Sequence, residues 1–193
     1  MSRPIRAAQA TFTSAFSKAE TKGRKAFDWY VRSMWEGDQG WIHSYRFTWG
    51  QYDRYDATIT TNHGVRVAVE IKYRPSYTFD KTYRMKGDVL FEREKYEALL
   101  TLVDDGVFDD AIYATFWSDW GCTLFSVRDI ATRVHTLRQG NMWCPKQTVG
   151  NTRKVLKPCI FPQRKDALLE IDPRHTTYSQ RLGTLHTWQS STT

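Results

Sequence analysis

Hydrophobic and polar residues alternate most regularly across residues 55–74, and this pattern predicts a β-hairpin. Its two arms, residues 56–61 and 65–73, are rich in β-branched side chains. Between them lie residues 62–64, with the sequence Asn-His-Gly. A three-residue loop with glycine in its last position supplies the left-handed backbone that such a turn requires. We therefore expect two antiparallel strands joined by a tight turn.

The length of that loop fixes the register of the hairpin. Thr61 lies opposite Val65, so Asp56 lies opposite Glu70. Directly opposed residues point to the same side of a sheet, with Cβ atoms about 4.5–5.5 Å apart. Alternation divides the second strand into an apolar face of Val65, Val67, Val69, Ile71 and Tyr73 and a mixed face of Arg66, Ala68, Glu70, Lys72 and Arg74. We expect two carboxylates and one ammonium to lie together on the mixed face.

The rest of the chain alternates between the helical and the strand repeat. The predicted elements are helices over residues 17–35, 89–103 and 162–170, strands over 41–49, 111–117, 122–127 and 155–161, and a loop over 143–148. The order of a helix, three strands, a helix and further strands is typical of an α/β fold with helices on both sides of a mixed sheet. We expect about five strands in that sheet.

Some residues define the predicted ends and faces of these elements. Asp88 is the predicted N-cap of helix 89–103, and Ser126 can cap a short helix after the second of the later strands. In strand 41–49, strict alternation places Ile42 on the face opposite Tyr45 and Phe47.

Length and composition favour a single folded domain that spans residues 1–193. Hydrophobic residues make up 40% of the chain, but no apolar run is long enough to span a membrane. Residues 1–16 could form a flexible arm, and they lack the apolar core of a signal peptide. The three cysteines have no metal-binding spacing, so reduced thiols and a cytoplasmic location are the expectation.

Positive charge is concentrated in the last third of the chain. Residues 128–193 hold 11 Lys and Arg against 4 Asp and Glu, so this basic extension carries the whole formal net charge of +7. Such asymmetry favours a nucleic-acid partner, because phosphate backbones attract clustered cations. A solvated surface without a partner is the alternative interpretation.

The paired strands with Asp56, Glu70 and Lys72 resemble the PD-(D/E)xK phosphodiesterase superfamily, whose signature is Asp, a hairpin, then Glu-x-Lys. The residue before Asp56 is Tyr55 where the signature has proline, but that proline is not a metal ligand. The resemblance implies a restriction-endonuclease-like core and a Mg²⁺- or Mn²⁺-dependent nuclease, most simply a deoxyribonuclease. Compact members of this kind occur in phages and bacteria, so the expected setting is a bacterial or phage-infected cell.

The resemblance also implies roles for individual residues. Asp56, Glu70 and the Ile71 carbonyl would bind the metal, Lys72 would act beside it, and Glu20 is the matching glutamate of the first helix. Asp53 competes with Asp56, but only Asp56 enters the strand opposite Glu70. The expected nucleic-acid contacts are Arg74, Lys86, Lys95, Lys146, Arg153, Lys154 and Lys157, because phosphate binding needs cations near the site or on the basic extension.

Other interpretations stay open at this stage. The Glu70–Lys72 pair could be a surface ion pair on an amphipathic hairpin, Glu20 could satisfy backbone donors at a helix start, and Lys95 could extend into solvent along its helix. The chain could also be a nuclease-like module that binds nucleic acid or another protein without cleavage. Many members of the superfamily cut as dimers, so a homodimer is a further expectation.

Overall fold

The structure is a computed structural model that describes residues 18–32, 41–48, 53–79, 88–145 and 154–171. Its centre is a six-stranded sheet with strand order β1-β2-β3-β5-β6-β9. The strands are β1 (Ile42–Phe47), β2 (Ala57–Thr61), β3 (Arg66–Arg74), β5 (Asp110–Trp117), β6 (Cys122–Ser126) and β9 (Leu169–Ile171). Strands β3 and β5 are parallel and the other neighbours are antiparallel, so the predicted mixed sheet is confirmed.

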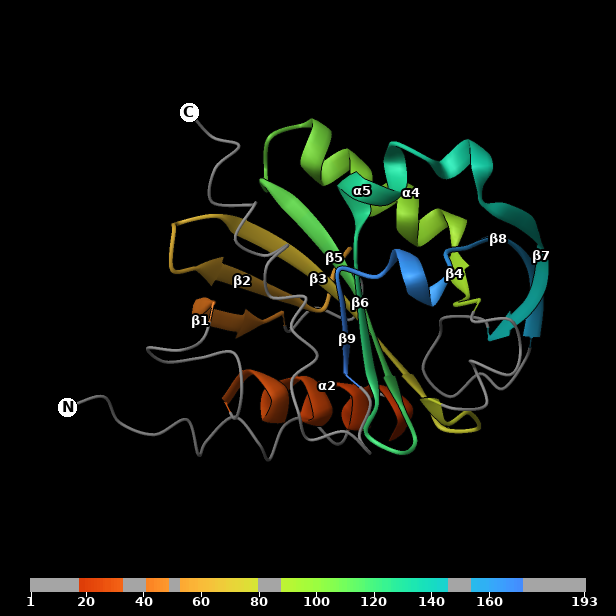
Figure 1. Cartoon of the computed structure of the whole chain (residues 1–193), viewed down its shortest axis with the longest axis horizontal. Helices are drawn as coiled ribbons and strands as arrows, with labels where there is room; N and C mark the ends of the chain where they lie inside the picture. Colours follow the sequence, from red (N-terminus) through yellow and green to blue (C-terminus); the bar gives the residue numbers. More distant parts are fainter. Residues whose placement is uncertain (1–17, 33–40, 49–52, 80–87, 146–153, 172–193) are drawn as a thin grey trace.

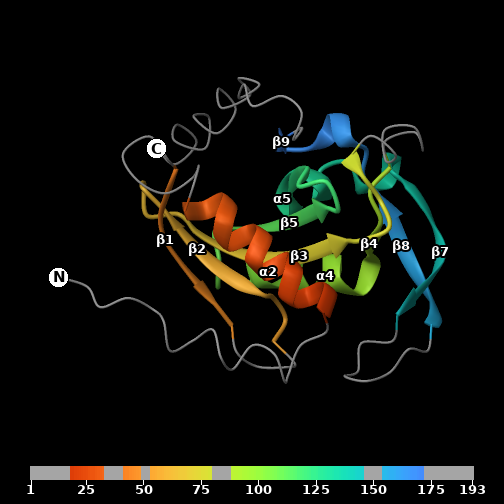
Figure 2. The same cartoon turned by 90° about the horizontal axis from the view of Figure 1, so that it is seen from below.

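Helices cover both faces of this sheet (Figures 1 and 2). Helix α2 (Lys18–Tyr30) packs on one face, where Phe27 and Tyr30 join the apolar side of β3 in a buried core. Helices α4 (Arg93–Asp104) and α5 (Val127–Ala131) cover the other face, where Leu99 and Ile130 belong to a second buried core. Both faces of β3 are therefore buried, and a charged residue on either face needs a partner.

The hairpin has the register that its loop length predicts. Ala57 pairs with Val69, which puts Asp56 opposite Glu70, and Thr61 donates its N–H to Val65. Gly64 has a φ of 79°, the left-handed conformation expected at the end of the loop.

The region after α5 differs from the prediction. Residues 143–148 were predicted as a loop, but strand β7 (Arg138–Pro145) extends through Trp143 and pairs with β8 (Lys154–Phe161). With β4 (Phe91–Glu92), these strands form a second sheet of three strands in the order β4-β8-β7. Pro145 ends the strand, and a terminal proline costs no internal ladder bond.

Two predicted helices also change. Helix α4 begins at Arg93 with Glu92 as its N-cap residue, because the residues before it pair with β8. Asp88 instead forms an ion pair with Arg138. The predicted helix over 162–170 is a 3₁₀ turn, Arg164–Asp166, followed by β9. Ser126 caps α5 by accepting the N–H of Asp129, as predicted.

A β-bulge changes the faces of β1. The pairing with β2 shifts between Ile42 and Ser44. Ile42, Tyr45 and Phe47 consequently share the α2 side of the core, where strict alternation had separated Ile42 from the two aromatic residues.

Within the described residues, no helix is long and apolar enough to cross a membrane. The three cysteines are buried, and the Sγ atoms of Cys144 and Cys159 lie 3.9 Å apart. The proposed arm over residues 1–16 lies outside the described residues.

Candidate functional site

Glu70 is a buried carboxylate in the middle of the sheet, only 2% exposed. It lies on β3 opposite Tyr113 of the parallel strand β5, on the face that α4 covers. Its Oε1 is 2.9 Å from Nζ of Lys72, and its Oε2 is 3.3 Å from Nζ of Lys95. Two ammonium groups from two different elements therefore hold one carboxylate in place. A surface ion pair on an exposed hairpin is excluded, because Glu70 is not at the surface.

Asp56 lies just before β2, and its carboxylate is held on the side of α2. Its Oδ1 accepts a hydrogen bond of 3.1 Å from Arg24, and its Oδ2 accepts one of 2.7 Å from the N–H of Ile71. Ile71 lies beyond Val69, the last residue of β3 that β2 pairs with. The Asp56 side chain thus satisfies an amide that the shorter strand leaves without a backbone partner.

The electrostatics of the two carboxylates differ although they influence each other. Burial and, after it, the negative charge of Glu70 together raise the pKa of Asp56 to about 6, against the opposing effects of Lys72, the Ile71 N–H and Arg24. Burial also disfavours ionised Glu70, but the charges and hydrogen bonds of Lys72 and Lys95 outweigh it and lower the pKa of Glu70. The pKa of Lys72 is raised, chiefly by Glu70 against the effect of burial.

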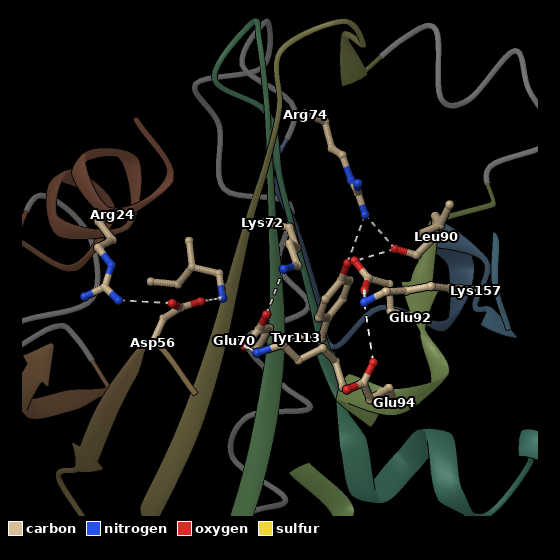
Figure 3. Close-up of polar contacts among 12 residues, drawn as sticks. Arg24, Asp56, Glu70, Lys72, Arg74, Leu90, Glu92, Glu94, Tyr113 and Lys157 are labelled. Carbon is tan, nitrogen blue, oxygen red and sulfur yellow. Dashed lines mark hydrogen bonds and ion pairs between the residues drawn. The ribbon is translucent and has the colours of Figure 1, made fainter. Parts of the chain in front are cut away.

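Figure 3 shows Asp56 turned toward Arg24, whereas Glu70 is turned toward Lys72. The expectation that both carboxylates gather with Lys72 on the mixed face is therefore wrong for Asp56, whose side chain is drawn toward α2 by Arg24 and by the N–H of Ile71. A second polar group lies beyond Lys72, where Tyr113 donates its hydroxyl to the Leu90 carbonyl at 2.8 Å. The Tyr113 ring stacks on Phe91 with centroids 3.8 Å apart, which ties β5 to the short strand β4.

Two residues that were predicted to contact nucleic acid belong to this second polar group. Arg74 donates to the Leu90 carbonyl and to the Tyr113 hydroxyl, at 2.8 and 3.0 Å. Lys157 lies 2.8 Å from Glu92 and 3.4 Å from Glu94, and its side chain is 15% exposed. Both cations are therefore engaged within the fold.

The other predicted residues have mixed placements. Lys95 contacts Glu70 and so faces the site; it does not extend into solvent away from it. Glu20 lies half-buried in the first turn of α2, one turn before Arg24. Lys154 is exposed at the start of β8. Lys86, Lys146 and Arg153 lie outside the described residues.

Arg24 and Tyr113 are site residues that the sequence reasoning missed. Arg24 is 3% exposed, and its second contact is a 2.8 Å hydrogen bond to the Thr48 carbonyl. The sequence could have indicated this role, because Arg24 follows Glu20 by four residues and the two therefore lie on the same side of the helix. Tyr113 falls in a strand that is buried along its whole length, where the sequence offers no sign of a polar role.

The donor set of the site suits a hard divalent cation. An ionised carboxylate offers about four acceptor positions, and the described contacts use two on each of Asp56 and Glu70. Within the described residues, no third His, Cys, Asp or Glu joins them in a cluster able to hold a metal. Mg²⁺ is commonly bound through one or two carboxylates, with water and substrate phosphate completing its shell. The two carboxylates therefore suit such an ion by the type of their donor atoms, while in this structure Asp56 is turned toward Arg24 and Glu70 toward Lys72.

No protein-family model matches the chain, and neither a curated protein nor a solved structure matches it.

Proposed function

We propose that this protein is a metal-dependent nuclease that hydrolyses phosphodiester bonds, most simply those of DNA. The observation that carries the proposal is the buried Glu70, gripped by Lys72 and Lys95 and electrostatically coupled to Asp56 across a hairpin. Strongly perturbed, mutually coupled ionisable groups are typical of functional sites. A purely structural core would gain more from apolar residues of similar volume.

The roles follow from the chemistry of each group. Asp56 and Glu70 would hold Mg²⁺ or Mn²⁺, with the Ile71 carbonyl and Glu20 as the further ligands that the PD-(D/E)xK resemblance implies. The bound ion would supply Lewis-acid charge at the phosphoryl group and lower the pKa of the attacking water. Lys72 would orient that water and stabilise the charge that develops on the phosphate oxygens. Lys95 would keep Glu70 ionised and hold its carboxylate in position beside Lys72.

The fold supports a restriction-endonuclease-like core as part of the same proposal. The core that the resemblance implies has a helix, three strands, a helix and further strands, with a mixed sheet between helices and the acids on a hairpin. Here β2 and β3 form the hairpin, and β5 lies parallel to β3 after α4.

The test is incubation of the purified protein with labelled linear, circular and branched DNA and with RNA, each with Mg²⁺, Mn²⁺ or EDTA. We expect metal-dependent cleavage of at least one substrate by the wild type and none by Glu70→Gln. Glu97→Gln is the matched control, because Glu97 is an acid of α4 that is 59% exposed and paired with Arg93. Cleavage by Glu70→Gln at the wild-type rate would refute the proposal.

A second candidate is a protein that binds nucleic acid without cutting it. It is favoured by one observation: each of the four oxygens of Asp56 and Glu70 already has a cationic or N–H partner. The two functions separate in the same assay. Persistent binding without cleavage of any substrate in either metal would favour the binding protein.

A further inference from the structure

The outer face of α2 carries positive charge along one line. Lys18, Lys22 and Lys25 are all exposed, and their spacing of four and three residues puts them on one side of the helix. The same side ends at Trp29, which is 48% exposed. No acid occupies these four positions, and we call the three lysines the lysine stripe. Lys22 also lies 5.7 Å from the ring centroid of Tyr73.

A second exposed tryptophan meets the end of this stripe. Trp120, in the turn between β5 and β6, is 56% exposed, and its ring centroid is 6.0 Å from that of Trp29. The two rings are inclined at 63°, so they meet in an edge contact and do not stack face to face on each other. In Figure 1 this turn lies beside the C-terminal end of α2, at the lower edge of the molecule. We call Trp29 and Trp120 the indole platform.

Trp120 is held in an unfavourable backbone conformation. Its φ is 68°, and within the described residues it is the one non-glycine residue with a positive φ. The turn of the first hairpin has the same need for a left-handed residue, and there Gly64 fills it with a φ of 79°. A bulky residue in this conformation is a true outlier, and such strain is often found at functional positions.

The surrounding contacts fix the turn in place. The Phe79 N–H donates to both carboxylate oxygens of Asp119, at 2.9 and 3.1 Å. The Tyr30 hydroxyl donates to the Trp120 carbonyl. A Cβ atom at Gly121 would come within 2.7 Å of the Phe79 side chain, so the turn packs too closely on that ring to admit a side chain at this position. These contacts hold the Trp120 ring outward, where its own burial gains little.

We propose that the lysine stripe and the indole platform together bind a single-stranded segment of nucleic acid. Phosphates would lie along the lysines, and an unpaired base would stack on an exposed indole. Bases of a duplex are already stacked on each other, so a platform of this kind selects strands with unpaired bases. From Lys18 to Trp29 the helix rises by roughly 16 Å, the reach of a few nucleotides. The inference rests on the proposed function for the choice of nucleic acid as the ligand.

The base contact is tested by fluorescence anisotropy with labelled oligothymidylate and with an abasic strand of the same length. EDTA is present, so binding is measured without cleavage. We expect Trp120→Gly to weaken oligothymidylate binding about tenfold or more, to leave binding of the abasic strand unchanged, and to raise or preserve the melting temperature, since glycine relieves the strained turn. Trp29→Ala, which leaves the turn intact, should also weaken oligothymidylate binding and leave binding of the abasic strand unchanged. Wild-type oligothymidylate binding by both variants would overturn the proposal, as would an equal loss on both strands.

The phosphate contact is tested by the salt dependence of the same binding. Replacing Lys18, Lys22 and Lys25 by Gln should reduce the slope of log K against log salt by about 2. The charge-matched control replaces Arg66, Arg128 and Lys165 by Gln, all of them exposed on other elements, and should change the slope less. If the lysine variant lost binding to phosphatidylserine vesicles but kept its oligothymidylate slope, the surface would be a membrane contact and the proposal would fall.

The two proposals fail separately. Cleavage that persists while Trp120→Gly and Trp29→Ala bind normally removes only the inference about this surface. Specific oligothymidylate binding with no cleavage in any metal removes only the nuclease.

Discussion

Asp56 and Glu70 are opposed in one hairpin, yet the protein treats their charges in opposite ways. Glu70 is surrounded by two ammonium groups that lower its pKa. At Asp56, burial and the charge of Glu70 prevail over Lys72, the Ile71 N–H and Arg24, so its pKa rises to about 6. The difference indicates that the surrounding charges, rather than the depth of burial alone, decide how readily each carboxylate ionises.

This contrast has a consequence for a metal site. Glu70 is charged and oriented by Lys72 and Lys95 before any ion arrives. The charge of Asp56 is unfavourable in the free protein, so a divalent cation would stabilise that carboxylate most. We expect Asp56 to couple metal binding to stability, and Glu70 to maintain the architecture.

The largest expected effect is that of Glu70→Gln. Loss of the carboxylate leaves two ammonium groups without their buried counter-charge, and breaking a buried pair in this way costs about 3–5 kcal/mol. Cleavage should disappear as well. Urea unfolding in EDTA measures the first effect, and Asp56→Asn is the comparison. If Asp56→Asn destabilised the protein more than Glu70→Gln at pH 7, the contrast between the two carboxylates would be wrong.

Lys72→Met should lower the cleavage rate about 10²–10⁴-fold, the usual contribution of a group that positions or transfers a proton. Glu70 keeps Lys95 as a partner in this variant, so the protein should remain folded by circular dichroism. A rate within tenfold of the wild type would show that Lys72 acts only as a counter-charge.

The pH dependence of stability separates the two carboxylates directly. Because the folded pKa of Asp56 is about 6 and its ordinary value is 3.8, stability contributed by its neutral form is complete below pH 3.8 and is lost as the pH rises through 6. The loss is about 3 kcal/mol at most. The lowered pKa of Glu70 acts oppositely, since its contribution is lost as the pH falls below its ordinary value of 4.5.

Unfolding in EDTA between pH 4 and pH 8 measures this effect, with Asp56→Asn as the reference. The wild type should lose stability relative to Asp56→Asn mainly between pH 4 and pH 6. A difference that stayed constant over this range would contradict the raised pKa of Asp56.

The smallest expected effect is that of Lys95→Met. This variant removes one of the two cations at Glu70 and retains Lys72, at a cost of about 1–2 kcal/mol, consistent with the loss of one hydrogen bond to a charged group. Thermal unfolding measures it, and Arg93→Met, which breaks an exposed pair with Glu97 on the same helix, is the control. Equal effects of the two changes would show that Lys95 contributes no more than a surface charge.

Local patterns predicted the elements whose form depends on neighbours in the chain. The loop of three residues with Gly64 fixed the hairpin register, and the turn residues 118–121 marked the boundary between β5 and β6. The prediction failed where distant strands competed with local propensity. Residues 88–92 read as a helix start, but β8 pairs with Phe91 and Glu92 and delays α4 to Arg93.

For the candidate site, the sequence by itself determined that Asp56 and Glu70 are opposed in the register of two strands, because backbone periodicity and loop length suffice for that. Only the tertiary structure decided which cation meets which acid. Arg24 and Lys95 come from helices on opposite faces of the sheet, and no spacing along the chain encodes how two helices dock. Ionisation of a buried carboxylate depends on the charges within a few ångströms of it, and those neighbours are set by packing.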